Sequence, residues 1–124
     1  MKARIVEFSD TEESREHFAL IYQGFLSGGN GPGAKPMDVI RREATILDKM
    51  EAISYEEMDQ ESNQPTGKRL LHPGEQRLSL SQPEYELLKR YFENTPWTTK
   101  VSRKVVEISD WLSAIPLGEE SGGR

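Results

Sequence analysis

Residues 77–116 decide the fold of this chain and read RLSLSQPEYELLKRYFENTPWTTKVSRKVVEISDWLSAIP. Leu78 and Leu80 alternate with a serine, which predicts a short strand with one buried face. Ser81 then stands where a helix N-cap belongs. Glu84 follows three residues later in the capping-box pattern, with a proline in the first turn. The sequence therefore predicts a strand that runs directly into a capped helix.

Two helices are expected within this stretch. Apolar residues from Tyr85 to Phe92 recur at helical spacing, and the proline at position 96 ends the first helix. The second helix is expected to begin near residue 98 or 99 and to end at Pro116. Because only a few residues separate them, the two helices should lie side by side as a hairpin. Trp97 at the elbow is either a core anchor, which we favour because large aromatics are highly buried on average, or an exposed binding anchor.

The composition limits the classes of function. The chain has 124 residues, no cysteine, 30% charged residues and a formal net charge of −5. One domain is expected, and disulfides, thiolate zinc sites and cysteine nucleophiles are excluded. No apolar run approaches the ~20 residues of a membrane span, and the N-terminus does not resemble a signal peptide. We expect a cytoplasmic protein, or a virion-associated one if it is phage encoded, and the acidic balance argues against broad nucleic-acid affinity.

The N-terminal half predicts a strand and two helices. Residues 3–8 are rich in β-branched and aromatic side chains, which favour a strand. Ser9 and Glu12 repeat the capping-box pattern, so a helix is expected to begin there. A second helix is expected over 37–53. His17 lies beside the apolar face of the first helix, and because no second histidine stands at ligand spacing, a metal role is not expected for it.

Three segments are expected to be flexible. The glycine-rich stretch at 27–36 lacks both the preceding strand and the Gly-Lys-Ser/Thr ending of a phosphate-binding loop, so a mobile connector is favoured. Residues 55–68 are polar and acidic and predict a flexible linker. The tail at 117–124 is rich in glycine, glutamate and serine and is expected to be disordered. The remaining chain, 1–116, is expected to form a single small domain.

Residues 69–80 predict a hairpin, because Pro73 and Gly74 suit the centre of a type II turn. Together with the strand at 3–8, this gives a small antiparallel sheet of about three strands with three to four helices packed on it. The expected class is therefore α+β. The alternative is a mostly α-helical bundle with a β-hairpin as an appendage.

Catalytic motifs are absent from the sequence. It contains no Gly-x-Ser-x-Gly, no HExxH, no histidine pair and no cysteine motif, so we expect no catalytic residue, no metal ligand, no cofactor and no enzyme activity. His17 and His72 could meet in the fold, but nothing in the sequence places them together. A nucleotide-binding or hydrolytic role for the loop at 28–33 is a third hypothesis.

The leading hypothesis is a non-enzymatic protein–protein interaction module that acts as an accessory, assembly or regulatory protein. It rests on the helix at 37–53, whose apolar arc is wider than one contact surface needs. This helix is either central in the fold or half-covered by another chain. The partner is expected to be another protein or a second copy in a homo-oligomer. The candidate partner-binding residues are Val39, Ile46, Met50, Ile53, Tyr91 and Trp97.

The alternative hypothesis is a nucleic-acid-binding regulator that uses the basic C-terminal helical pair. Residues 68–104 hold eight lysines and arginines against four aspartates and glutamates. Two helices joined by a short break can place one helix in a groove, although this break ends in Pro-Trp and the whole chain is acidic. The candidate nucleic-acid contacts are Lys89, Arg90, Lys100, Arg103 and Lys104.

In size, acidic composition and organisation, the chain resembles accessory proteins of phage and mobile-element operons. The resemblance rests on its lack of cysteine, its two expected flexible segments within the chain and its net charge. It implies an accessory role and assigns no site residue.

Overall fold

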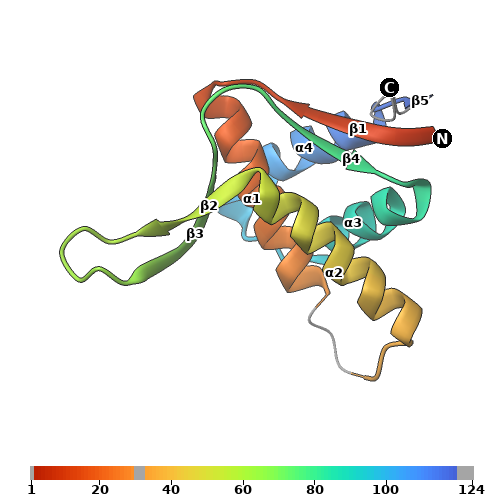
Figure 1. Ribbon diagram of the computed structural model, residues 1–124, viewed down its shortest axis with the longest axis horizontal. Coiled ribbons are helices and arrows are strands. Elements are labelled where there is room, and N and C mark those ends of the chain that lie inside the picture. Colours follow the sequence, from red (N-terminus) through yellow and green to blue (C-terminus); the bar gives the residue numbers. More distant parts are fainter. Residues whose placement is uncertain (1, 30–32, 120–124) are drawn as a thin grey trace.

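A three-stranded antiparallel sheet lies along one side of the protein (Figure 1). The computed structural model describes residues 2–29 and 33–119. The central strand is β1 (Lys2–Phe8), which pairs with β4 (Gln76–Leu80) on one side and with β5 (Leu117–Glu119) on the other. The predicted strand at 3–8 and the predicted α+β class are both confirmed.

The register of the sheet explains which of its residues are buried. Val6 lies opposite Leu78, and Arg4 lies opposite Leu80. Because successive side chains of a strand point to opposite faces, this pairing gathers Val6, Leu78 and Leu80 on the face that the helices cover, and all three are fully buried. Leu78 and Leu80 therefore alternate with Ser79 because one face of the strand is buried, as predicted.

Four α-helices occur in the described part of the chain, and they pack below the sheet in the view of Figure 1. The helix α3 packs most extensively against α1, and it also contacts α4 and α2. The predicted pairing of the two C-terminal helices is therefore present but is not the main helix contact. A 3-10 turn (Thr99–Val101) leads into the last helix. The helices are α1 (Glu12–Gly28), α2 (Met37–Ala52), α3 (Gln82–Asn94) and α4 (Ser102–Ser113).

The first residues of α3 and α1 show where the local sequence correctly predicts a helix cap and where it does not. The capping box of Ser81 and Glu84 is formed as predicted, with the Ser81 hydroxyl accepting from the Glu84 amide and the Glu84 carboxylate accepting from the Ser81 amide. The predicted cap at Ser9 is wrong. Thr11 caps α1 by accepting from the amide of Ser14, while Ser9 donates its own amide to the Ser14 hydroxyl.

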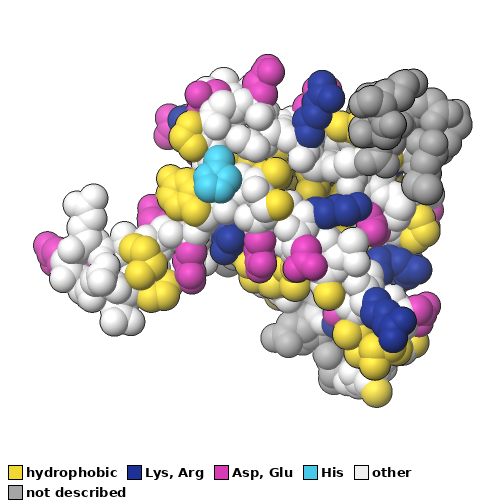
Figure 2. Space-filling view, in the orientation of Figure 1, with side chains coloured by type: hydrophobic (Ala, Val, Ile, Leu, Met, Phe, Trp, Pro, Cys, Tyr) yellow, Lys and Arg dark blue, Asp and Glu magenta, His cyan; other side chains and the backbone are white. Residues whose placement is uncertain are grey.

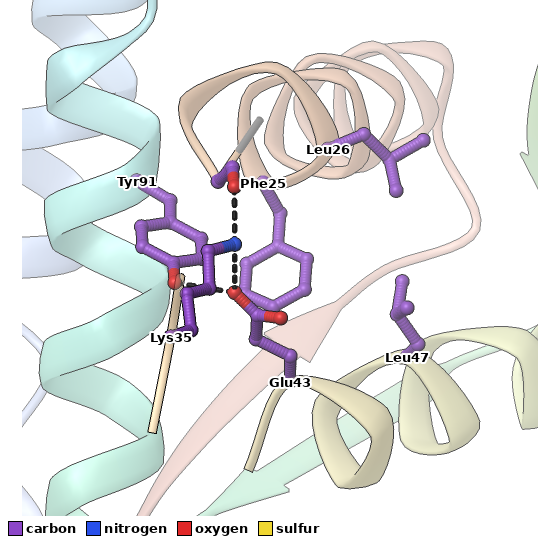
Figure 3. A pocket seen from close by; sticks show the side chains of 7 residues that line it. Phe25, Leu26, Lys35, Glu43, Leu47 and Tyr91 are labelled. Carbon is purple, nitrogen blue, oxygen red and sulfur yellow. Dashed lines mark hydrogen bonds and ion pairs between the residues drawn. The ribbon is translucent and has the colours of Figure 1, made fainter. Parts of the chain in front are cut away.

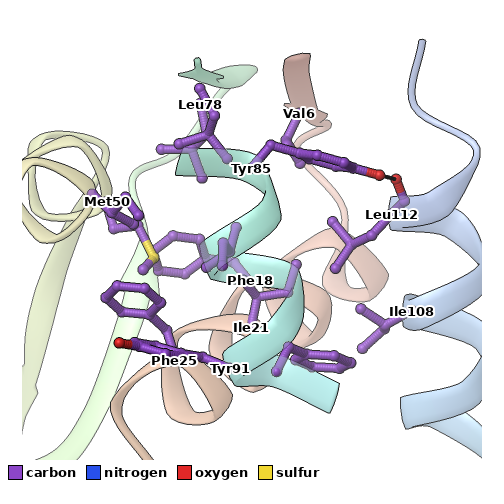
Figure 4. Packing of buried hydrophobic residues seen from close by; sticks show 14 of the residues in the cluster. Val6, Phe18, Ile21, Phe25, Met50, Leu78, Tyr85, Tyr91, Ile108 and Leu112 are labelled. Atoms are coloured by element: carbon purple, nitrogen blue, oxygen red, sulfur yellow. Dashed lines mark hydrogen bonds between the residues drawn. The ribbon is translucent and has the colours of Figure 1, made fainter. Parts of the chain in front are cut away.

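All four helices contribute to one hydrophobic core (Figure 4). Phe18 and Ile21 of α1 and Ile108 and Leu112 of α4 are fully buried in it. Tyr85 of α3 places its ring in the same core and donates its hydroxyl proton to the carbonyl of Leu112 at 2.5 Å. The Leu112 carbonyl also accepts from the Ile115 amide at 3.3 Å, so the Tyr85 hydroxyl adds a side-chain donor at the C-terminal end of α4.

The contact between α1 and α3 depends on glycine. A Cβ at Gly28 would lie 1.8 Å from the carbonyl oxygen of Tyr91, and one at Gly24 would lie 2.8 Å from the rings of both Phe92 and Trp97. Real side chains essentially never approach so closely, so these two positions let the helices meet. The Thr95 hydroxyl joins the same contact by donating to the Gly24 carbonyl at 2.8 Å.

A second sheet, made of two antiparallel strands, projects away from this body (Figure 1). Its strands are β2 (Ser54–Met58) and β3 (Pro65–Leu71). The predicted linker at 55–68 is therefore wrong, because most of it forms this hairpin. The predicted pairing across Pro73 and Gly74 is also wrong, because β3 pairs with β2 and β4 pairs with β1. Gly74 does have the positive φ of 91° that a type II turn requires, but the strands on either side diverge.

The ends of the other expected flexible segments also differ from the prediction. Residues 117–119 form β5 and pair with β1, so the first part of the expected disordered tail is a strand. The rest of that tail, 120–124, and the middle of the glycine-rich loop, 30–32, lie outside the described residues. Among the helices that are described, none is long and apolar enough to cross a membrane.

Candidate functional site

The most prominent surface feature is the two-stranded projection formed by β2, β3 and their connecting turn, which we call the arm. Its base is fixed to the body by Arg69, whose guanidinium donates to the Ser54 hydroxyl at 2.8 Å and lies 5.8 Å from the centre of the Tyr22 ring. The Ser54 hydroxyl in turn donates to the Met50 carbonyl at 2.6 Å, and Leu71 is buried in the core. The arm therefore leaves the body at a defined place.

The turn of the arm is built by its own polar groups. The Asp59 carboxylate accepts from the amides of Glu61 and Ser62 at 2.8 and 3.2 Å. The Asp59 amide donates to the Gln64 carbonyl at 2.8 Å, and Asn63 adopts a positive φ of 57°. Aspartate and asparagine favour such turns because short polar side chains can bond to the nearby backbone. The stretch that looked like a linker thus closes a hairpin.

Beyond its base, the arm exposes apolar side chains. Tyr55 is 43% exposed and Met58 is 45% exposed. Figure 2 shows hydrophobic side chains on the projecting arm among acidic ones. The ring of Tyr55 lies 5.4 Å from that of His72, which is its main aromatic neighbour. Large apolar groups placed on a projection bury little area within their own chain, so they are available to another molecule.

The arm is also acidic. Residues 55–68 carry four carboxylates against a single lysine, Lys68. Glu57 accepts a hydrogen bond from the Thr66 hydroxyl at 2.8 Å, and Asp59 shapes the turn. The surface therefore combines two exposed apolar side chains with a negative border. Two arms paired through the same β2 edge would place like charges opposite each other, which is unfavourable.

The helix α2 has an inward and an outward apolar line. Ile46 and Met50 face inward and are fully buried, whereas Met37 and Ile40 are 60% and 43% exposed. The broad arc predicted for this helix is therefore real, but its surplus lies on the outward line. In Figure 2, hydrophobic side chains are visible at the end of α2 as well as on the arm.

The structure accordingly rearranges the candidate partner-binding residues. Ile46, Met50 and Tyr91 are buried within one chain, so they are not available to a partner in this conformation. Val39 and Ile53 are half-buried against the same core. Exposed Tyr55, Met58, Met37 and Ile40 are the residues that the sequence interpretation missed. Each has carboxylates or basic residues close by in the sequence, so no unbroken apolar signal marked them.

Trp97 packs against the core of its own chain and remains partly exposed. Its ring lies 5.1 Å from that of Phe92, and its indole N–H donates to the Phe92 carbonyl at 2.8 Å. It is half-buried and packs against the core beside Gly24. This side chain fixes the angle at which the chain leaves α3.

A small polar cluster of Lys35, Glu43 and Tyr91 lies where α1, α2 and α3 meet (Figure 3). The Lys35 ammonium is 2.6 Å from the Glu43 carboxylate and also donates to the Gly29 carbonyl. The Tyr91 hydroxyl donates to the same Glu43 oxygen, and the ammonium lies 5.4 Å from the centre of the Tyr91 ring. The three side chains satisfy one another, and the cavity beside them measures about 120 Å³.

These contacts shift the pKa values of all three groups. Burial alone would raise the pKa of Glu43, but hydrogen bonds from Lys35 and Tyr91 hold it below its ordinary value. The hydrogen bond to Glu43 raises the pKa of Lys35. Burial and the bond to Glu43 raise the pKa of Tyr91. Because the charges are paired and the cavity is below the roughly 300–1,000 Å³ of ordinary ligand pockets, the cluster is best explained as a link between α2 and the loop after α1.

The basic residues proposed to contact nucleic acid do not form one free surface. Lys89 pairs with Glu93 at 3.2 Å, and Lys104 lies 3.7 Å from carboxylate oxygens of both Glu16 and Glu107. Arg90, Lys100 and Arg103 are exposed. The outer face of α4 that carries Arg103 also exposes Glu107 and Asp110. A mixed outer face is poorly suited to a polyanion, because phosphate contacts require a concentration of positive charge.

The two histidines lie in different surroundings. His72 is exposed beside Tyr55 of β2, whereas His17 is buried beside Trp111, with ring centres 5.3 Å apart. Glu13 and Glu107 approach His17, and these three residues could hold a metal ion. The i,i+4 spacing of Glu13 and His17 can be read from the sequence, but the approach of Glu107 depends on the packing of α4 on α1.

Comparison with protein-family models, with curated proteins and with solved structures finds no match for this chain.

Proposed function

We propose that this protein is a non-enzymatic protein–protein interaction module, an accessory, assembly or regulatory factor, and that the arm is its main contact element. One observation carries the proposal: a two-stranded projection that contributes little beyond its base to the core exposes Tyr55 and Met58. Ordering such a segment costs conformational free energy. A partner that covers these side chains would offset that cost.

The mode of binding follows from the geometry of the arm. A two-stranded sheet has unpaired backbone groups along its outer edges, and an added strand can satisfy them. The exposed side chains then supply apolar contact area, while the carboxylates set the charge of the partner. We therefore propose a partner protein that presents an extended or apolar segment bordered by lysine or arginine.

The outward line of α2 provides a second contact area. Met37 and Ile40 are large and exposed, and Leu26 of α1 is 46% exposed. Leu26 and Leu47 line the pocket that also contains Glu43, so apolar surface continues between α1 and α2 (Figure 3). A partner that reached both the arm and α2 would bury more area than the arm alone offers.

Affinity purification of the wild type and two variants from the source cells tests the proposal. The variants are a Tyr55→Lys/Met58→Lys double variant and a Val106→Lys control. Val106 is 59% exposed on α4, so its substitution adds a charge to an apolar surface position away from the arm. We expect quantitative mass spectrometry to identify a protein that the wild type and the control retain and the double variant loses. Equal retention by all three would contradict a role for the arm.

Light scattering over a range of concentrations distinguishes self-association from binding to another protein. Like charges on the β2 edge disfavour symmetric pairing of two arms, so we expect a monomer. A dimer that the double variant disrupts would identify a second copy as the partner. A dimer that the double variant leaves intact would place the interface elsewhere.

A further inference from the structure

A cleft beside the N-terminal half of α1 brings one histidine and two carboxylates together. Glu13 and His17 are one helical turn apart on α1, and Glu107 reaches them from α4. One ligand atom from each residue lies within 4.8 Å of the others. The remaining wall includes Trp111 and the hydroxyl groups that surround the start of α1.

His17 is the unusual member of this cluster. Its side chain is 10% exposed, and its Nε2 atom is buried without a hydrogen-bond partner among the described residues. The Glu13 carboxylate oxygen is 3.8 Å away, which is too far for a hydrogen bond. Buried polar atoms in proteins almost always have a partner. The Nε2 atom therefore lies buried near the Glu13 carboxylate with its bonding capacity unused.

The ring position of His17 is fixed by its surroundings. It packs against Trp111 with ring centres 5.3 Å apart and an interplanar angle of 43°. Glu13 and Glu107 have side chains that are 65% and 54% exposed, so they can turn without disturbing the core. A ligand shared by the three would meet one rigid nitrogen and two adjustable carboxylates.

We propose that Glu13, His17 and Glu107 form a site for a divalent transition-metal ion of the zinc class. An imidazole nitrogen and carboxylate oxygens bind Zn²⁺ at about 2.0–2.2 Å, so two ligands of one ion lie roughly 3–4 Å apart. The present separations of up to 4.8 Å close to that range by rotation of the exposed carboxylates. Magnesium and calcium select oxygen ligands, and a buried imidazole therefore favours the transition metal.

Lys104 competes with a bound ion for the Glu107 carboxylate. Its ammonium lies 3.7 Å from the Glu107 carboxylate and 3.7 Å from that of Glu16. Both distances exceed normal hydrogen-bond length, and Glu107 has a second oxygen. Metal binding therefore requires the Glu107 carboxylate to turn toward His17, and it adds a direct link between α1 and α4. Because the ion binds the folded chain, it raises the stability of that state.

Isothermal titration of the EDTA-treated protein with ZnCl₂ tests the site. We expect one Zn²⁺ ion per chain, and we expect Glu107→Gln to weaken binding by about tenfold or more, since loss even of a group that supports a metal ligand typically costs about that much. Glu107 is exposed, so this variant is expected to fold. Two control variants, Glu12→Gln and His72→Gln, remove an exposed acid near the start of α1 and the other histidine, and both should leave the affinity unchanged.

Fluorescence locates the ion. In a Trp97→Phe variant, Trp111 is the remaining tryptophan, and Co²⁺ bound at His17 should quench its emission. Addition of Glu107→Gln should remove the quenching, and excess Zn²⁺ should reverse it. Equal affinity for Zn²⁺ in the wild type and in Glu107→Gln, or equal binding of Mg²⁺ and Zn²⁺, would show an unspecific acidic surface and overturn the proposal.

Discussion

The body and the arm are held together by different interactions. In the body, Phe18, Phe92 and Leu112 are completely removed from solvent, and four helices and a sheet share one core. In the arm, residues 58–68 are all exposed, and backbone pairing and polar turn contacts hold the strands together. The body can therefore derive its stability from burial, whereas the arm leaves Tyr55 and Met58 exposed to solvent.

This difference separates stability from function in the chain. Substitutions in the body should change the free energy of unfolding, while substitutions in the outer arm should leave it almost unchanged and affect binding. Surface changes away from structural features usually alter stability by no more than about 0.5 kcal/mol. The contrast can therefore be tested with matched pairs of variants.

The largest effect is expected from Phe92→Ala. Phe92 is fully buried against Trp97, and truncation of such a phenylalanine costs about 3–5 kcal/mol of unfolding free energy. The matched change in the arm is Met58→Ala, which should stay within about 0.5 kcal/mol of the wild type. Denaturant unfolding followed by circular dichroism measures both values. A loss of similar size at Met58 would show that the arm contributes to the core.

A smaller loss is expected from Gly28→Ala. The new Cβ would lie 1.8 Å from the Tyr91 carbonyl oxygen, so α1 and α3 must separate. Overpacking of this kind costs roughly 1–3 kcal/mol. The exposed neighbour Ser27 provides the control, since Ser27→Ala should be close to neutral in the same unfolding experiment. If Gly28→Ala proved as stable as the wild type, the close approach of the two helices would be wrong.

The smallest of the three effects is expected from Glu43→Gln, and it depends on pH. Loss of the charge weakens the bonds to Lys35 and Tyr91 and should cost about 1 kcal/mol at neutral pH. The pKa of Glu43 is lowered from 4.5, so its contribution is complete above that pH and is lost as the pH falls through the lower, folded value. The pKa of Tyr91 is raised from 10.0, so its contribution is complete below that pH and is lost as the pH rises further.

The free energies of unfolding of the wild type and of Glu43→Gln should therefore differ most between about pH 5 and pH 9. The difference should shrink on both sides of that window. An exposed control, Glu51→Gln, should show no such window. A difference between the wild type and Glu43→Gln that did not depend on pH would indicate a packing effect instead of the charge contacts of this cluster.

The sequence predicts the body better than the arm for a physical reason. The alternation at Leu78 and Leu80 and the capping box at Ser81 are local signals, and the structure forms both. The strand pairing of β4 is set by contact with β1, which lies far away in the sequence. Gly74 has the positive φ expected for a type II turn, but local turn residues alone do not decide which strands pair.

The candidate site was less predictable than the fold. The helical period showed that α2 has a wide apolar arc, but it could not show which line of that arc packs inward. Ile46 faces the core and Ile40 faces solvent because of where the helix lies against β2, β4 and α3. Likewise, the two carboxylates near His17 come from different helices, and only their packing brings them together.

Photo-crosslinking in the source cells is the most direct test of the role of the arm. A photoreactive amino acid is placed at Met58 on the arm, or at Val106 or Arg103 on α4, and all three positions are exposed. We expect a discrete crosslinked protein from position 58 and none from position 106 or 103. Crosslinking from position 103 or 106, with none from 58, would contradict the arm as the contact element.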